Sequence, residues 1–316
     1  MTMFSRKTIG LIGARGYVGQ ELMSLLARHP GFEVAFVSSR TTAGEPVPGV
    51  PGLVFEDLDA AAIAARRPDA LVLALPNDLS HPIVEAIDAA HPETVIVDVS
   101  ADHRFDAAWV YGLPEHHRAQ IRGHRRIANP GCYATATALA VRPLAGLLAG
   151  PAHAFGVSGY SGAGTTPSPR NDVEALRDNL MPYALTGHLH EREVTRHAAP
   201  VCFVPHVAPF FRGITVTVSM MFDRPVSKDE LAMRLTEAYA GEPLVSVVEG
   251  IPLVRAIAGK PGAALGGVSA DEARRHGVVV STLDNLLKGA AGQAVQNLNL
   301  AFGFPEMEGI LPWPSP

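Results

Sequence analysis

Cysteine is scarce in this chain, and so are positive charge and long apolar runs. Cys132 and Cys202 are the only cysteines among 316 residues. Two thiols cannot form a disulfide framework, and neither lies at the spacing of a zinc site. Acidic residues outnumber basic ones by 31 to 26, which argues against a protein that binds nucleic acid through a basic surface. We therefore expect no nucleic-acid partner.

No apolar segment is long enough to cross a bilayer, and no cleavage signature follows Met1. With so few cysteines, this pattern favours a reducing, cytoplasmic setting without a membrane partner. The composition, with 47% hydrophobic and 18% charged residues, is that of an ordinary globular enzyme. The length allows two domains, each with its own core.

The chain begins with a pattern typical of a dinucleotide-binding fold. Residues 7–12 form an apolar strand pattern, a glycine-rich turn with spacing G-x-x-G-x-x-G follows, and residues 20–30 show helical apolar spacing up to a proline. Glycines let the backbone approach a pyrophosphate that rests on the helix's first amides. The expected cofactor contacts in this turn are Gly13, Arg15, Gly16, Tyr17 and Val18.

The second strand, 32–37, ends in Ser38, Ser39 and Arg40. An NAD-binding site usually has an acidic residue here to bind the ribose hydroxyls, whereas an arginine suits the 2′-phosphate of NADP. Two hydroxyls and a guanidinium in this place predict NADP as the cofactor.

Helices and strands then alternate. Helices are expected at 60–67 and 81–90, and strands at 70–75 and 94–98, which predicts a parallel sheet covered on both faces, a Rossmann-type α/β domain. Ligands bind at the carboxyl ends of such strands. At these ends, Pro76 could face the nicotinamide, and Ser100 and Arg104 could receive an anionic substrate group.

Cys132 is the expected nucleophile. Pro130 and Gly131 break the preceding segment, and the small residues after Tyr133 favour a helix that Pro143 ends. A thiol in the first helical turn faces amides without an internal partner and the positive end of the macrodipole, which lower a thiol pKa toward neutral. The alternative is a small buried side chain without chemistry.

The second half is expected to be an α+β domain with a largely antiparallel sheet. Strands are predicted at 152–158, 214–221, 244–248 and 278–283, with a helix at 227–239. The loop 159–166 mixes glycines with hydroxyls, so Ser161 and Gly162 could close on substrate or nicotinamide. Residues 284–300 predict a helix that returns to the first domain.

We therefore expect an NADP-binding domain at 1–131, completed by a C-terminal helix at 285–303. A catalytic, substrate and dimerisation domain is expected at 132–284, and a loose tail at 304–316.

His188 and His190 are the candidates for acid and base, because a cysteine nucleophile needs a group that titrates near neutral pH. Glu193, three residues after His190, could orient it on a helix. A metal is not expected, because no third ligand stands at a zinc spacing and the segment is not H-E-x-x-H.

Several stretches together resemble the N-acetyl-γ-glutamyl-phosphate reductase family, within the wider aspartate-semialdehyde dehydrogenase group. The likeness runs in order along nearly the whole chain, and Asn129-Pro130-Gly131-Cys132-Tyr133 is its most specific part. It also rests on the glycine turn, residues 158–164, the paired histidines, residues 205–209 with Arg212-Gly213, and residues 284–290. In one departure, Leu189 and Arg192 stand where the family commonly has arginine and proline.

The resemblance implies NADPH-dependent reduction of an acyl phosphate through a thioester on Cys132, as a step of arginine biosynthesis. His188 or His190 would act as acid and base, and Arg104 would bind the leaving phosphate. Arg212 or Arg192 would bind the substrate carboxylate. The remaining residues that the resemblance places at the substrate are Asn129, Ser158 and His206, and the one at the cofactor is Asn285.

Two other interpretations remain open from the sequence. A sister enzyme could act on aspartyl phosphate or a longer acyl phosphate with the same nucleophile. A non-catalytic NADP-binding sensor could keep the fold with an ordinary thiol. An exposed antiparallel sheet would also favour self-association, as a homodimer or a homotetramer.

Overall fold

The computed structural model describes residues 6–310. The chain divides into two compact units, one made of the residues up to Pro130 together with those from Ala290 onward, the other of Gly131–Gly289. In the described part of the chain, no helix combines the length and the apolar character that a membrane crossing needs.

The first unit is built on a seven-stranded sheet in the order β3-β2-β1-β4-β5-β7-β6. Every neighbouring pair is parallel, which confirms the expected Rossmann-type sheet. Its strands are buried apolar runs, as strands covered on both faces should be. Their bounds are β1 Lys7–Ile12, β2 Phe32–Ser38, β3 Phe55–Glu56, β4 Ala70–Leu73, β5 Val95–Asp98, β6 Val110–Tyr111 and β7 Arg126–Ala128.

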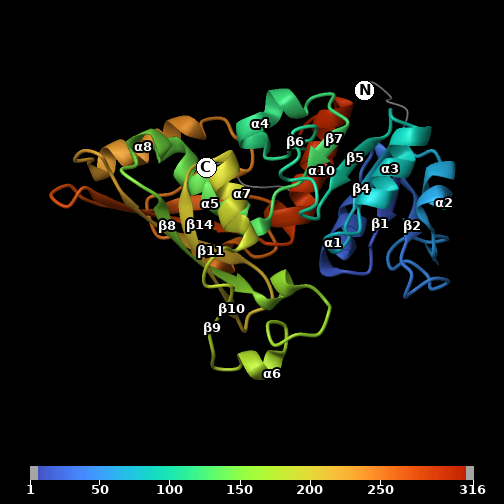
Figure 1. Cartoon of the computed structure of the whole chain (residues 1–316), viewed down its shortest axis with the longest axis horizontal. Helices are drawn as coiled ribbons and strands as arrows, with labels where there is room; N and C mark the ends of the chain where they lie inside the picture. The colour runs from blue at the N-terminus through green and yellow to red at the C-terminus, as the bar shows by residue number, and fades with distance from the viewer. Residues whose placement is uncertain (1–5, 311–316) are drawn as a thin grey trace. The chain divides into compact units, whose positions relative to one another are not determined.

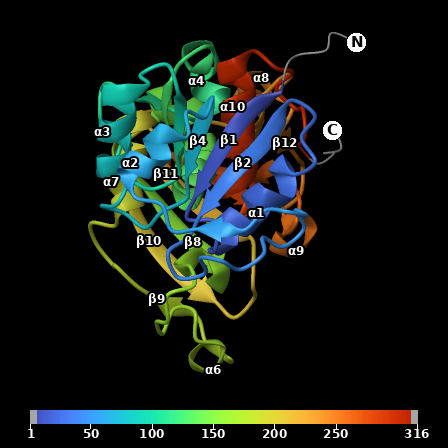
Figure 2. The same ribbon diagram turned by 90° about the vertical axis from the view of Figure 1, so that its right-hand side faces the viewer.

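Helices cover both faces of this sheet (Figure 2). On one face, Ile63 of α2 and Ile83 and Ile87 of α3 pack against Phe36 and Leu71 of the strands. On the other, α1 and α10 lie side by side, and His29, just after α1, forms a hydrogen bond of 2.9 Å with Asn299 of α10. The helices are α1 Tyr17–Leu26, α2 Ala60–Ala65, α3 His81–Ala90, α4 Pro114–Ile121 and α10 Gly292–Phe302.

The last helix differs from the expected one at its start. Residues 287–291 form a π-helical turn, η3, before α10 begins at Gly292. The residues from 285 to 289 belong to the second unit, so only the part from Ala290 onward completes the first. The two glycines in this stretch explain the irregular turn, because glycine weakens a regular helix.

The expected loose tail is wrong for residues 304–310. Phe304 and Ile310 are buried, and the carboxylate of Glu306 forms a two-pronged ion pair with Arg118 at 2.7 and 3.0 Å. The side chain of Asn299 donates to the carbonyls of residues 306 and 308. Proline spacing could not reveal these contacts. The remainder of the tail, 311–316, lies outside the described residues.

The second unit contains another seven-stranded sheet, in the order β12-β13-β14-β11-β8-β10-β9. It is mixed, because β8–β10 and β12–β13 are parallel pairs while the other neighbours are antiparallel. The expectation of a largely antiparallel sheet is confirmed. The strands are β8 Ala152–Gly159, β9 Met181–Pro182, β10 Val201–Ala208, β11 Ile214–Met221, β12 Val245–Val247, β13 Ala263–Asp271 and β14 His276–Leu283.

One face of this second sheet carries the core of the unit. Tyr133 and Leu139 of α5, Val194 of α7 and Leu231 of α8 pack with strand residues such as Phe203. The elements outside the sheet are α5 Cys132–Val141, η1 Arg142–Leu147, η2 Tyr160–Ala163, α6 Val173–Leu176, α7 Leu189–His197, α8 Lys228–Ala238 and α9 Val254–Ile257. Figure 1 shows α5 and α7 together over the strands, with α6 on the long excursion between β8 and β9.

The opposite face of the sheet stays open. Phe155 and Met221 are 45% and 48% exposed, and the register aligns Phe155 with Val204 of β10 and Thr217 of β11 in one row. Because side chains alternate along a strand, this row lies away from the core.

A buried carboxylate ends strand β5. Asp98 is fully buried, and it accepts hydrogen bonds from the backbone N–H and the hydroxyl of Ser100 at 3.0 and 2.8 Å. Burial raises the pKa of Asp98 to about 6, more than these hydrogen bonds lower it. The folded chain therefore holds this proton more tightly than the unfolded chain does.

We compare the free energy of unfolding of the wild type with that of Asp98→Asn. As the pH rises from about 4 to about 6, we expect the wild-type value to fall relative to the variant by roughly 3 kcal/mol in total. The native state binds the extra proton in this window, so its stabilisation is lost as the pH rises. Urea unfolding at several pH values measures the difference. The exposed Asp229→Asn variant is the control, and a pH-independent difference for Asp98→Asn would refute the assignment.

Candidate active site

Cys132 is the first residue of helix α5. Gly131 is the N-cap in an extended conformation, with φ −70° and ψ 151°. The helix runs for 10 residues to Val141, and Pro143 lies in the 3₁₀ turn that follows. The predicted position of the thiol at a short helix's start is confirmed. There the first backbone N–H groups have no partner within the helix.

A buried carboxylate holds this helix start in place. Glu193 of α7 is fully buried, and its Oε1 accepts the N–H of Gly131 at 2.8 Å. Within a capping box, an acidic residue of the same helix serves the N-cap amide, whereas here a second helix supplies the carboxylate. The expected partnership of Glu193 with His190 stays a prediction.

Gly289 lies directly against the nucleophile. A β-carbon at this position would be 2.6 Å from the Cβ of Cys132 and 3.2 Å from the carbonyl oxygen of Asp284. No real β-carbon tolerates the shorter distance, so the absence of a side chain at 289 sets the space around the thiol. The sequence predicted only that glycines here pack closely against something.

The two candidate histidines lie at the start of helix α7. His188 is its N-cap, and its Nδ1 accepts the backbone N–H of His190 at 3.1 Å. The two rings are 4.8 Å apart, and the ring of His190 is 6.0 Å from that of Tyr133. Burial lowers the pKa of His188 below its usual value, opposed by Glu193 and Glu191. The lowered pKa favours the neutral form of His188.

Tyr183 joins this cluster, and nothing in the sequence singled it out. Its ring lies 5.5 Å from that of His188, and burial raises its pKa, with the nearby charge of Cys132 adding to the shift. Cys132 has the same effect on Tyr133. We name Cys132, Tyr133, Tyr183, His188 and His190 the cysteine–histidine cluster.

Arg212 forms a two-pronged ion pair with a buried carboxylate. Its Nε and Nη2 lie 2.6 and 2.9 Å from the two oxygens of Asp284. The same carboxylate accepts the N–H groups of Gly259, Leu286 and Leu287. The sequence did not identify Asp284 as the anchor of this arginine. Binding of a substrate carboxylate by Arg212 stays a prediction.

Four of the predicted residues converge in the second unit. The side-chain amide of Asn285 donates to the hydroxyl of Ser161 at 2.9 Å, and its oxygen accepts the N–H of Gly213 at 2.7 Å. A β-carbon on Gly162 would lie 2.9 Å from the hydroxyl of Ser158. Through these contacts, the loop at residues 159–166 packs against the segment after β14.

The structure corrects the expectation for His206. Its ring packs on Phe155 at 4.1 Å, on the open face of the sheet, whereas α5 packs on the other face. The part of His206 that approaches α5 is its backbone carbonyl, which accepts the hydroxyl of Tyr133 at 2.6 Å. Alternation along β10 decides this orientation. Arg192 is exposed on α7.

In the first unit, a cavity of about 490 Å³ follows the glycine turn and the ends of β1, β2 and β4. Gly13 has φ +83°, and a β-carbon on it would lie 2.3 Å from the carbonyl oxygen of Ala74. Gly16 is the N-cap of α1 and has open space beside it. The predicted residues that line the cavity are Gly13, Arg15, Gly16, Ser38, Ser39 and Arg40.

This cavity fits a dinucleotide, because it joins a helix N-terminus to hydroxyls and an exposed guanidinium. Asp57, Asp59 and Leu79 also line it, and the sequence did not predict them. Tyr17 and Val18 begin α1 and are not among the lining residues. Pro76 is exposed just after β4.

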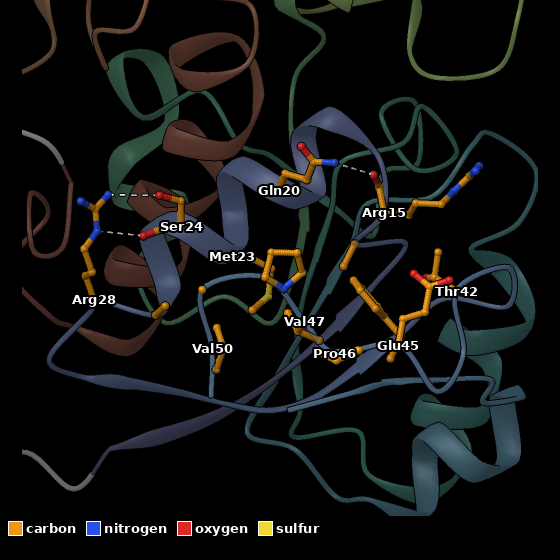
Figure 3. Close-up of a pocket in the computed structure, with 15 residues that line it drawn as sticks. Arg15, Gln20, Met23, Ser24, Arg28, Thr42, Glu45, Pro46, Val47 and Val50 are labelled. Atoms are coloured by element: carbon orange, nitrogen blue, oxygen red, sulfur yellow. Dashed lines mark hydrogen bonds between the residues drawn. The ribbon is translucent and has the colours of Figure 1, made fainter. Parts of the chain in front are cut away.

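A second cavity of about 690 Å³ lies between α1 and the loop that precedes β3. Figure 3 shows Met23, Pro46 and Val47 around it, with Gln20 donating to the carbonyl of Arg15. This cavity is larger, but Gly13 and Gly16 of the glycine turn do not line it. Residues 38–40 at the end of β2 do not line it either. The smaller cavity is therefore the cofactor candidate.

Three residues predicted to bind substrate are buried in the first unit. Arg104 donates to the carbonyls of Asn129 and Val99 at 2.9 and 3.0 Å, and the side chain of Asn129 joins Ala290 and Asn297. The hydroxyl of Ser100 donates to Asp98. These contacts brace the ends of β5 and β7, and a substrate role for the three stays a prediction.

Comparison with known proteins decides the family. Residues 8–124 match the model of the semialdehyde dehydrogenase NAD binding domain, and residues 132–285 that of the semialdehyde dehydrogenase dimerisation domain. A protein of Stenotrophomonas maltophilia named N-acetyl-gamma-glutamyl-phosphate reductase is 56% identical, over 96% of this chain and 98% of that relative. One of Xylella fastidiosa with the same name is 52% identical, over 98% and 95%. The chain belongs to the N-acetyl-gamma-glutamyl-phosphate reductase family.

This member of the reductase family is therefore an NAD(P)-dependent semialdehyde dehydrogenase. Its fold is also that of solved aspartate semialdehyde dehydrogenases. The Vibrio cholerae enzyme II matches with a TM-score of 0.77 at 19% identity, over 95% of this chain and 99% of that one. The Candida albicans enzyme, solved with NADP, matches with a TM-score of 0.72 at 16% identity, over 94% and 99%.

Gly289→Ala should disturb the nucleophile of this reductase-family member without unfolding it. The added methyl group must displace Cys132 or the turn that carries residue 289, and a misplacement of this size costs roughly tenfold to a hundredfold in rate. Turnover and iodoacetamide labelling of Cys132, in a Cys202→Ser background, measure the effect. Gly146→Ala is the control, because a β-carbon there meets nothing within 4 Å. Wild-type labelling and turnover in Gly289→Ala would contradict the prediction.

Proposed function

We propose that this chain reduces N-acetyl-gamma-glutamyl phosphate to N-acetyl-glutamate semialdehyde with NADPH, as a step of arginine biosynthesis. The observation that carries the proposal is the helix-end thiol of Cys132, whose helix start is held by buried Glu193 of α7, the helix that begins at the two histidines. Relatives that are 52–56% identical over nearly the full length bear the matching name.

The first chemical step belongs to Cys132. Its thiolate attacks the acyl carbon and forms a carbon–sulfur bond. The acyl C–O bond then breaks, inorganic phosphate departs, and the acyl group remains on the sulfur as a thioester. The unpartnered amides of the first turn of α5 favour the thiolate and can stabilise the oxyanion that forms during attack. Reduced nicotinamide, when bound, supplies the hydride for the thioester carbonyl. Collapse of the resulting thiohemiacetal frees the aldehyde and regenerates the thiol.

We assign the acid–base role to His190 and a positioning role to His188. The Nδ1 of His188 accepts the amide of His190, so the neutral ring of His188 carries its proton on Nε2. That ring has no second lone pair free to accept a proton. Orientation of His190 by Glu193, one helical turn away on α7, is part of the proposal.

The glycine turn and the end of β2 would hold the cofactor. Gly13 and Gly16 allow the pyrophosphate to approach the N-terminus of α1. Ser39 and Arg40 line the same cavity, and a guanidinium there favours the 2′-phosphate of NADP over the hydroxyl of NAD. On the substrate, we propose Arg104 for the phosphate and Arg212 or Arg192 for the carboxylate.

We propose that the chain acts as a homo-oligomer. Residues 132–285 match a dimerisation domain, and the open face of the second sheet presents exposed Phe155 in its row. A second copy would cover that row and remove it from water.

The sister reaction on aspartyl phosphate is the nearest alternative, and a panel of semialdehydes decides between them. We expect phosphate-dependent reduction of NADP with N-acetyl-glutamate semialdehyde, at a kcat/KM at least about a hundredfold above that with aspartate semialdehyde. NAD in place of NADP should be the poorer cofactor. Preference for aspartate semialdehyde would reject the proposed substrate.

Cys132→Ser should abolish turnover, with a loss of roughly a thousandfold or more, while NADPH still binds. A hydroxyl at this site is a far weaker nucleophile, whereas the cofactor contacts are unchanged. Steady-state rates and NADPH fluorescence titration separate the two effects. Cys202→Ser is the control and should retain activity. Turnover near the wild-type rate in Cys132→Ser would reject the thioester mechanism.

A further inference from the structure

Arg170 places a guanidinium beside the cysteine–histidine cluster. It lies on the loop between η2 and α6, its side chain is exposed, and its guanidinium stands 5.0 Å from the ring centroid of Tyr183. An arginine over an aromatic face is held in direction while its N–H donors stay available. Tyr183 in turn packs against His188. One aromatic ring therefore separates Arg170 from the first histidine.

The electrostatic reach of Arg170 agrees with this geometry. Its charge lowers the pKa of His188, after the larger effect of burial. It also opposes the rise in the pKa of Tyr183 that burial and Cys132 produce. Arg170 is thus a cation whose charge reaches both His188 and Tyr183.

The loop that carries Arg170 is braced. The side-chain amide of Asn171 donates to the carbonyls of Gly164 and Thr166, both at 2.8 Å, and its oxygen accepts the N–H of Ser168 at 2.8 Å. Asp172 caps α6 through the amide of Glu174 at 3.0 Å. These contacts lie on both sides of Arg170, so its position does not depend on one flexible tether.

Two of the three arginines that the sequence predicted at the substrate already bind groups of the protein itself. Arg212 donates two hydrogen bonds to Asp284, and Arg104 donates to two backbone carbonyls. Within residues 6–310, by contrast, Arg170 has no carboxylate and no other hydrogen-bond acceptor, only the face of Tyr183.

We propose that Arg170 binds an oxyanion of the substrate, phosphate or carboxylate, next to the cysteine–histidine cluster. The inference rests on the proposed function, because an acyl phosphate that also carries a carboxylate offers both groups. A guanidinium can grip either of them with two parallel hydrogen bonds. The long excursion between β8 and β9 thereby takes part in substrate recognition.

The reverse reaction tests the two sources separately, because inorganic phosphate and the semialdehyde are then independent reactants. For Arg170→Gln we expect one of the two KM values to rise roughly tenfold to a hundredfold, with a smaller change in kcat. A rise for inorganic phosphate assigns Arg170 to the phosphate, and a rise for the semialdehyde assigns it to the carboxylate. Arg170→Lys should recover part of the affinity, since it keeps the charge but loses the fork.

Arg177→Gln is the matched control, because Arg177 is exposed on the same excursion but pairs with Glu174 at 2.6 Å. It should keep both KM values. Arg170→Gln with both KM values within twofold of wild type, or with a loss confined to kcat, would overturn the proposal.

Turnover of the semialdehydes by the wild-type protein tests the proposed function independently of the Arg170 variants. If wild type prefers another semialdehyde, the proposed substrate is rejected, and the same test of Arg170 runs with that semialdehyde. If wild type turns over none of them, both proposals fall.

Discussion

The hydrogen bond from the Gly131 amide to the buried carboxylate of Glu193 is the constraint on which the candidate site depends. It fixes the residue before Cys132, and so the direction in which helix α5 starts. Burial makes the contact strong and its loss expensive, because a carboxylate without a partner in the interior is destabilising. Since Glu193 lies on α7 with His190, one interaction sets the nucleophile and the histidines relative to each other.

A second buried carboxylate, that of Asp284, holds the turn that contacts Cys132. Asp284 directly follows β14, pairs with Arg212, and accepts the N–H groups of Leu286 and Leu287 at the start of the turn. That turn brings Gly289 against Cys132. A side chain at position 289 would collide with the nucleophile, so this turn needs glycine there. Two acidic residues therefore hold the backbone segments that precede and contact Cys132.

The first unit shows how much of the fold could be predicted from patterns. Apolar runs, helical spacing and the turn at Gly13 and Gly16 predicted the parallel sheet and the cofactor cavity, because each depends on residues close in sequence. The same patterns could not reveal that Phe304 and Glu306 dock on this unit. Nor could they show that Arg104 and Asn129 would form hydrogen bonds within the protein near the ends of β5 and β7. Such contacts join residues distant along the chain.

The sequence by itself determined the two-unit plan, the dinucleotide turn and the placement of Cys132 at a helix start. Proline, glycine and apolar periodicity act over a few residues, so their effect on structure can be predicted from neighbouring residues alone. Only the tertiary structure decided which groups surround the thiol. It placed Tyr183 beside His188 and Arg170 over the ring of Tyr183, and it turned His206 toward the open face. Packing between strands and helices, rather than local preference, chooses the neighbours and the exposed face of each side chain.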